Sequence, residues 1–159
     1  MTTRNTGLVA NFEAIPQVAN NAAELAGVLR TASGTVELLA GDSTDNDIVM
    51  LAPIPSNASI PQLFVGADEL GGTCTYNVGL YKTDGTVKDE DVFATAVDVP
   101  AVLADLRFEA ANLNTGSKKL WELAGDSTDP GGYFYVAVTF SATGGSAGTM
   151  NWNIHYIVN

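Results

Sequence analysis

One stretch near the end of the sequence has the spacing of a hydrolase motif. Gly144, Ser146 and Gly148 fit G-x-S-x-G, the sharp turn that exposes a nucleophilic serine. That turn requires a preceding strand, a following helix, and then an acid and a histidine further along the chain. Here a strand is expected after the motif, no carboxylate follows Asp129, and His155 comes only nine residues after Ser146. We therefore interpret the motif as a Gly-rich hairpin loop and expect no enzymatic activity.

Acidic side chains gather in two loops of the same sequence. Leu-Ala-Gly-Asp-Ser-Thr-Asp spans residues 39–45 and recurs at residues 123–129. The carboxylates make Asp42, Asp45, Asp126 and Asp129 candidate calcium ligands, because Ca²⁺ prefers oxygen ligands. The spacing is not that of an EF-hand, and Asp and Ser in such loops commonly bond nearby backbone groups. We favour solvated Asx turns and expect neither a metal nor a cofactor.

Each of two reactive residue types occurs once, at Cys74 and His155. A single cysteine allows no disulfide within the chain, and the pair supplies too few ligands for a zinc site. Cys74 lies on an alternating segment and is expected in the core. His155 is expected on the surface or at an interface, where its titration near neutral pH leaves a pH-sensing role open.

Most of the elements that carry these residues are predicted to be strands. Alternating or continuous apolar residues indicate strands, and turn residues recur about every ten positions, as in a sandwich or jelly roll. The strands are expected at 28–31, 35–39, 48–54, 60–65, 73–82, 133–140 and 150–158, with a turn at Ser33-Gly34. The predicted core includes Val36, Leu38, Val49, Leu51, Leu63, Val65, Val78, Leu80, Phe134, Val136, Val138 and Ile154. The two acidic loops then fit a double Greek key, with both loops at similar ends of the sandwich.

Helices are expected to be few and short. Asp89–Ala96 is the best candidate, because its first turn is acidic and complements the helix dipole. Ala101–Leu106 fits either a short helix or the start of a strand that continues to Phe108. Asn20–Leu25 could form a helical turn that stops at Gly27. The fold class is therefore an all-β antiparallel sandwich with one or two short helices.

The first 27 residues differ from the rest in composition. Their apolar residues follow no strand rhythm but are too numerous for a solvated tail. We predict an extended N-terminal arm over residues 1–27, which lies on a neighbouring subunit, and a β-sandwich domain over residues 28–159. The partner-binding residues of the arm would be Leu8, Val9, Phe12, Ile15 and Val18.

The overall charge and hydropathy restrict the partners. The net charge is −11, the wrong sign for a phosphate backbone or an anionic membrane. No apolar run reaches the ~18 residues of a membrane span, and the first seven residues do not resemble a signal peptide. We expect no binding to nucleic acid or membrane, and a cytosol-like compartment. The charged fraction of 16% is low against about 25% in typical proteins, which suggests that partners cover part of the surface.

Three segments resemble small virion proteins of tailed bacteriophages, including phages of cyanobacteria and marine bacteria. They are Asp-Ile-Val-Met-Leu-Ala-Pro-Ile-Pro at 47–55, the run from Val78 to Val87, and the run from Ala124 to Thr139. The similarity covers most of the chain from about residue 28, in the same order. It implies a jelly-roll-like sandwich that decorates and cements the outer capsid surface of a virion assembled in the host cytoplasm. The implied partners are the major capsid protein and further copies of the chain, as a trimer rather than a dimer.

Two other roles remain open at this stage. Small β-sandwiches also occur in phage tails and fibres. A carbohydrate-binding module for host attachment would stack sugars on exposed aromatic rings. Its candidate platforms are Tyr76, Tyr81, Trp121, Trp152 and Tyr156.

Overall fold

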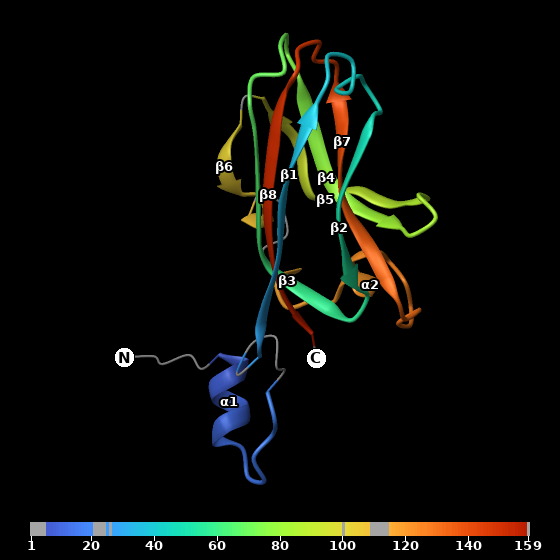
Figure 1. The fold of residues 1–159 in the computed structure, drawn as a ribbon. Coiled ribbons are helices and arrows are strands. Elements are labelled where there is room, and N and C mark those ends of the chain that lie inside the picture. The colour runs from blue at the N-terminus through green and yellow to red at the C-terminus, as the bar shows by residue number, and fades with distance from the viewer. Residues whose placement is uncertain (1–5, 21–24, 26, 100, 109–114, 159) are drawn as a thin grey trace.

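The structure, a computed structural model, describes residues 6–20, 25, 27–99, 101–108 and 115–158. Two antiparallel sheets of four strands each pack face to face (Figure 1). The strands are β1 (Leu29–Leu38), β2 (Ile48–Pro55), β3 (Ala58–Ala67), β4 (Thr75–Lys82), β5 (Val87–Asp98), β6 (Ala101–Asp105), β7 (Tyr133–Ala142) and β8 (Gly148–Val158). The helical elements are α1 (Gly7–Glu13), the 3₁₀ turn η1 (Leu106–Phe108) and α2 (Leu120–Leu123).

The strand order is that of a jelly roll. One sheet runs β1-β8-β3-β6 and the other β2-β7-β4-β5. Strands from the two halves of the chain pair in sequence, β1 with β8, β2 with β7, β3 with β6 and β4 with β5. The chain is thus one long hairpin rolled into two sheets, which gives the two Greek keys of this fold. The predicted jelly-roll-like β-sandwich is confirmed.

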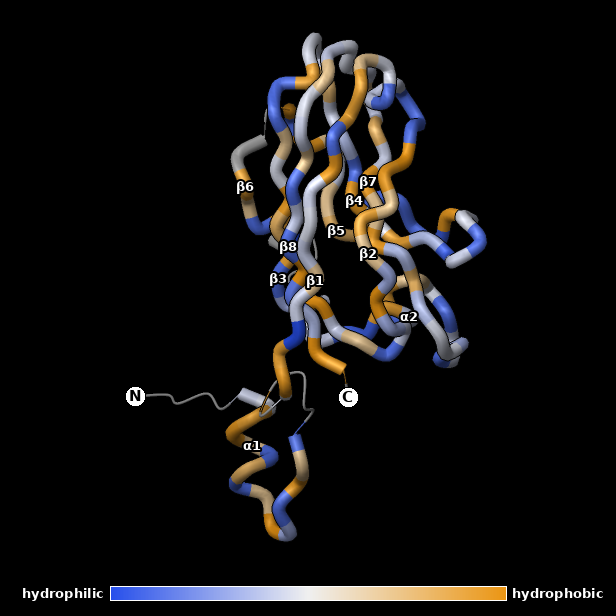
Figure 2. The backbone as a smooth tube through the Cα atoms, viewed as in Figure 1, coloured by the Kyte–Doolittle hydropathy of each residue, from blue (hydrophilic) through white to orange (hydrophobic). Residues whose placement is uncertain are grey.

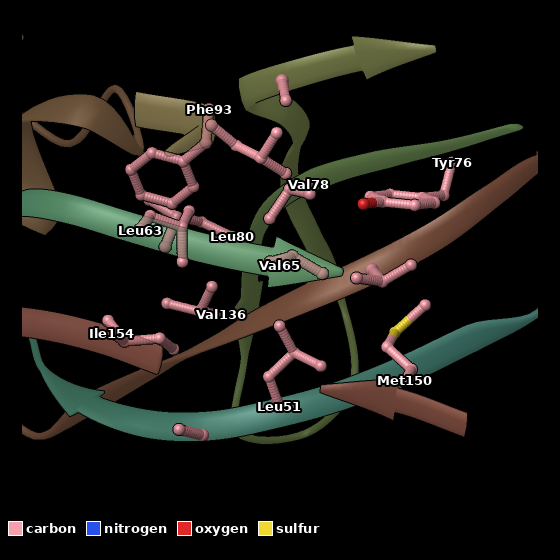
Figure 3. Packing of buried hydrophobic residues seen from close by; sticks show 14 of the residues in the cluster. Leu51, Leu63, Val65, Tyr76, Val78, Leu80, Phe93, Val136, Met150 and Ile154 are labelled. Carbon is pink, nitrogen blue, oxygen red and sulfur yellow. The ribbon is translucent and has the colours of Figure 1, made fainter. Parts of the chain in front are cut away.

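The hydrophobic core fills the space between the sheets, as Figure 3 shows for part of it. Side chains point inward at alternate positions, so Leu63 and Val65 of β3 meet Val78 and Leu80 of β4. Ten of the twelve predicted core residues are buried, namely Leu38, Leu51, Leu63, Val65, Val78, Leu80, Phe134, Val136, Val138 and Ile154. The other two, Val36 and Val49, are half-buried and pack against the edge of the core.

The predicted turn at Ser33-Gly34 is wrong, because β1 continues through both residues. Gly34 lies opposite Trp152 in the pairing of β1 with β8. A Cβ on Gly34 would come within 2.7 Å of the Trp152 ring. The glycine is therefore needed to leave room for an indole and not to reverse the chain.

The predicted helix at Asp89–Ala96 is also wrong, because these residues belong to β5. Phe93 and Ala94 are buried, whereas Glu90 and Asp91 are exposed at the edge of the sheet. Local composition favoured a helix start, but pairing with β4 decides the structure. For Ala101–Leu106 the strand alternative holds as far as Asp105, the last residue of β6, and η1 begins at Leu106.

Helix α1 lies beyond one end of the sandwich, below the start of β1 in the view of Figure 1. Sequence reasoning did not predict it, and no residue of the helix is buried. Figure 2 shows that apolar residues continue along this part of the chain, outside the two sheets. The helical turn expected at Asn20–Leu25 includes residues 21–24, which lie outside the described residues. Among the parts of the chain that the structure describes, no helix has the length and apolar composition needed to span a bilayer.

Candidate functional site

The serine of the hydrolase-like motif lies in the loop that joins β7 to β8, which crosses from one sheet to the other. The backbone N–H groups of Gly145 and Ser146 both donate to the carbonyl oxygen of Leu70, each at 2.8 Å. The loop is therefore held against the segment that links β3 to β4. A strand follows it, and no helix presents the serine hydroxyl as a nucleophile elbow requires.

The single histidine is engaged away from that serine. Nδ1 of His155 lies 2.8 Å from Oε1 of Gln62, and the imidazole meets the ring of Phe64 edge-on at 5.9 Å. No hydrogen bond joins His155 to Ser146 within the described residues. The geometry that a serine nucleophile and its base need is absent from these two side chains.

The first acidic loop closes the turn between β1 and β2 through its own carboxylates. Oδ2 of Asp42 accepts from the backbone N–H of Leu39 at 2.8 Å. Asp47 accepts in the same way from the N–H of Thr44, and Asp45 accepts from the side-chain amide of Asn46. Asp42 and Asp47 thus each satisfy a backbone donor three residues earlier, which is not the geometry of the expected Asx turn, and the Asp45 bond joins two side chains.

The second acidic loop makes longer-range contacts. Asp126 forms an ion pair with Lys88, with Nζ and Oδ1 2.6 Å apart. Oδ1 of Asp129 accepts from the Ser56 hydroxyl at 2.6 Å and from the N–H of Gly131 at 2.9 Å. These hydrogen bonds, that of Ser56 first, hold the pKa of Asp129 below its ordinary value. The loop is thereby fastened to the connection between β2 and β3.

The two acidic loops lie at opposite ends of the sandwich, so the expectation of similar ends is wrong. The first leads into Ile48, which pairs with the late β7 residue Thr139. The second leads into Tyr133 at the start of β7, which pairs with Pro55 at the end of β2. The four candidate calcium ligands therefore divide between two distant loops. No group of three or more His, Cys, Asp or Glu side chains suited to a metal occurs among residues that the structure describes.

The aromatic side chains proposed as sugar platforms are mostly covered. Tyr76 and Tyr81 are buried, and burial raises the pKa of the Tyr81 hydroxyl. Trp121, Trp152 and Tyr156 are half-buried and pack against the core. These rings therefore form parts of the sandwich interior rather than a row of exposed faces.

Cys74 lies in the core, as its place on an alternating segment indicated. Burial raises the pKa of its thiol and keeps it protonated at neutral pH. A buried, protonated thiol is a poor nucleophile and a poor metal ligand.

Four of the five predicted arm residues belong to the exposed large apolar side chains of the described residues. Ile15 is 98% exposed and Phe12 is 68% exposed, while Val9 and Val18 are exposed to a smaller degree. Leu8 is half-buried. Four of the five predicted residues therefore lack cover from their own chain, and they follow one another along α1 and the segment after it.

Sequence reasoning missed one buried cation. Arg107 in η1 is 5% exposed, and its guanidinium lies 5.4 Å from the ring centroid of Phe93. Arginine is rarely buried unless its donors are paired, so the residues around Arg107 in the sequence did not indicate its burial.

Comparison with solved structures finds similar chains in phage capsids. A chain of the capsid asymmetric unit of cyanophage Pam1 superposes with a TM-score of 0.53 at 18% identity, covering 84% of this chain and 86% of that one. A chain of the capsid of Ralstonia phage GP4 gives 0.52 at 16% identity, with the same coverage. This chain shares their fold. No protein-family model matches the sequence, and no curated protein matches it.

The matches extend over most of both chains, so the similarity concerns the whole sandwich. They confirm the fold that the phage resemblance implied, including its jelly-roll order. At this identity the agreement lies in topology and not in particular side chains.

Proposed function

We propose that the chain is a structural subunit of a phage virion, which decorates and cements the capsid by binding the major capsid protein as a homo-oligomer. The observation that carries the proposal is the exposed apolar surface of residues 6–20 on a jelly roll that resembles capsid chains. Residues 1–27 act as the binding arm and residues 28–159 as the body. The subunit is assembled in the host cytoplasm and occupies the outer capsid surface as a trimer.

The arm suits binding because burying its exposed apolar side chains against a partner is energetically favourable. Burying an exposed Ile, Phe or Val contributes about 1.5–3 kcal/mol each, and Ile15, Phe12 and Val18 are all exposed. A trimer engages several capsid sites at once, so modest contacts from each copy multiply in effect. Cementing therefore needs neither a large interface per copy nor catalysis.

The body suits the same task because it is acidic and because its core contains no residue of the arm. Among the described residues, every buried hydrophobic side chain lies between Leu38 and Ile157, which supports a body that folds without the arm. The net charge of −11 keeps separate copies apart until a matched surface is available. Among the described residues, Ser146, His155 and Cys74 do not combine into a catalytic group.

The test is binding to empty capsids assembled from the major capsid protein of the same phage, measured by co-sedimentation. The full chain is expected to bind, and the chain without residues 1–27 is expected to lose binding. Val18→Ser should weaken binding, whereas Val87→Ser should not, since both valines are 50% exposed but Val87 lies on β5. Equal binding with and without residues 1–27 would refute the role of the arm in capsid binding. No binding by the full chain would refute the cementing function.

A further inference from the structure

The sandwich is open on one side, where β1 and β2 are the end strands of their sheets. A groove of 470 Å³ lies there, between the end of β1 and the start of β2. Its lining is mixed, with acidic side chains beside the apolar residues Val36, Leu38, Ile48, Val49 and Met50. Ile48 and Met50 remain exposed, so the groove offers apolar surface that its own chain does not cover.

The strand edges beside the groove are less protected than the other two edges. Strand β6 has only five residues, and β5 is broken by register shifts and carries Asp89, Glu90 and Asp91. Short, irregular or charged edges resist pairing with another chain. Strand β2 carries no charge, its prolines lie in its second half at Pro53 and Pro55, and its pairing with β7 shifts register between Met50 and Ala52. Ile48, Val49 and Met50 pair regularly with β7, so the outer edge of this first stretch is suited to pairing with a further chain beside the groove.

The arm of the same molecule lies at the other end of β1. The arm enters the sandwich at Leu29, the first of the ten residues of β1, and the groove adjoins Leu38, the last of them. A strand of that length spans about 30 Å, and Figure 1 shows α1 beyond the end opposite the β1–β2 loop. The segment after α1 folds back on the helix, with the N–H of Val18 donating to the carbonyl of Asn11. An arm in this position reaches a neighbouring molecule rather than its own groove.

Charge also favours this pairing. Glu37, Asp42 and Asp47 line the groove. Residues 1–20 carry only two charged side chains, Arg4 and Glu13, in a chain of net charge −11. These two charges cancel, so an acidic groove repels the arm less than it repels the chain as a whole.

We propose that the groove between β1 and β2 receives the N-terminal arm of a second copy of this chain. The proposal deepens the proposed function, on which it rests, by naming the contact that holds the homo-oligomer together. The contact is head-to-tail, because an arm at one end of each molecule meets a groove at the other end of the next. Such contacts close into rings when the rotation between copies permits, and a threefold ring is the expected trimer.

The first test is disulfide cross-linking between full-length chains. One chain carries Phe12→Cys in the arm and the other carries Met50→Cys in the groove, while the buried Cys74 stays in both. Mixing and oxidation are expected to give a disulfide-linked pair, both in solution and on capsids. The control replaces Met50→Cys with Val87→Cys, which is exposed on β5. A yield no greater than that of the control would overturn the proposal.

The second test is the mass of the oligomer by light scattering. Ile48→Glu adds a charge to an exposed wall of the groove and should weaken self-association by roughly tenfold or more, as expected for losing one buried aliphatic contact. Val87→Glu adds the same charge elsewhere and should leave the mass unchanged. An Ile48→Glu chain that keeps the wild-type mass at every concentration would contradict the arm-in-groove contact.

The two proposals fail in different ways. If the full chain binds capsids through its arm but no Phe12–Met50 link forms, the arm docks on the capsid and only the groove assignment is wrong. If the link forms but no capsid binding is found, the oligomer contact holds and cementing is wrong.

Discussion

Replacing the buried arginine of η1 should destabilise the sandwich. Nε of Arg107 donates to the carbonyl of Ile60 at 2.9 Å, and Nη2 donates to the carbonyl of Thr115 at 2.6 Å. Its guanidinium also lies over the ring of Phe93. One side chain thus ties together β3, β5 and the segment after η1. Burial lowers the pKa of Arg107, and the nearby Asp105 opposes that shift.

Strand β3 explains why a donor is required at this place. The pairing of β3 with β8 shifts register between Ser59 and Gln62, so Ile60 and Pro61 fall outside the regular ladder. Proline has no N–H to contribute, and a bulge of this kind displaces neighbouring backbone groups from their strand partners. Arg107 supplies the hydrogen bond to Ile60 that the ladder does not, in a position shielded from water.

The magnitude follows from these contacts. Arg107→Met deprives two buried carbonyls of a charged donor, at about 1–3 kcal/mol each. Part of this is offset because a guanidinium no longer has to be desolvated. We expect a net loss of about 2–4 kcal/mol in the free energy of unfolding, which lowers Tm by roughly 5–15 °C for a chain of this size. Arg107→Lys should be intermediate, since an ammonium keeps the charge but not the planar fork.

The assay is urea unfolding followed by circular dichroism, with Arg30→Met as the control. Arg30 is exposed on β1, so its replacement should change the free energy by less than about 0.5 kcal/mol. If Arg107→Met unfolds at the same urea concentration as the wild type, Arg107 does not hold the two sheets together.

Other consequences can be checked by the same unfolding and melting measurements. Val136→Asp buries an unpaired charge in the core and should cost about 4 kcal/mol or more; a wild-type Tm would refute the assigned core. Gly79→Ala should cost about 3 kcal/mol, because the added Cβ would lie 2.1 Å from a β5 carbonyl, while Gly116→Ala has open space and should be neutral. Asp129→Ala removes the acceptor of the Ser56 hydroxyl and should lower Tm at pH 7. Since the folded pKa of Asp129 is depressed, its contribution is complete above the ordinary carboxyl pKa of about 4. The difference in Tm should therefore shrink as pH falls below about 4 and vanish only below the lower folded pKa. Ca²⁺ and EDTA should leave Tm unchanged, because the carboxylates of the acidic loops bond to groups of the protein itself. A rise in Tm with added Ca²⁺ would instead support a calcium site in these loops.

The core could be predicted because successive side chains of a strand point to opposite faces, so core-facing residues recur at every second position. Phe134, Val136 and Val138 point into the sandwich in alternation with Tyr135, Ala137 and Thr139, although Ala137 and Thr139 are buried as well. Val36 and Val49 follow this rule but lie where the sheets end, so they are only half-buried. Periodicity shows which way a residue points, and the position of the strand in the sheet decides how far it is covered.

The errors arose where distant segments decide the structure. Asp89, Glu90 and Asp91 fit the first turn of a helix, but β4 was available as a partner and an exposed edge tolerates the charges. Gly34 fits a turn, yet it makes room for Trp152, which is more than a hundred residues away in the sequence. Neither contact can be predicted from the residues that are near it in the sequence.

The topology also explains why the two acidic loops lie at opposite ends of the sandwich. Two copies suggested two equivalent halves, but in a rolled hairpin β2 and β7 are antiparallel neighbours. Loops that precede these two strands must therefore lie at opposite ends. The matching positions also bond differently, since Asp42 accepts from the N–H of Leu39 whereas its counterpart Asp126 pairs with Lys88. The repeated sequence therefore does not give the two loops the same contacts.

The arm combines exposed apolar side chains with a partly fixed backbone. A helix of seven residues is too short to be stable alone in water, and α1 has neither a side-chain cap nor a buried residue. Asn20 compensates by accepting from the amide of Asn11 at 2.8 Å and donating to the carbonyl of Leu8 at 3.3 Å. These polar contacts leave Phe12 and Ile15 free to meet a partner. Because part of the arm is already ordered, binding sacrifices less conformational entropy than it would for a fully flexible tail, and more of the burial energy remains for assembly.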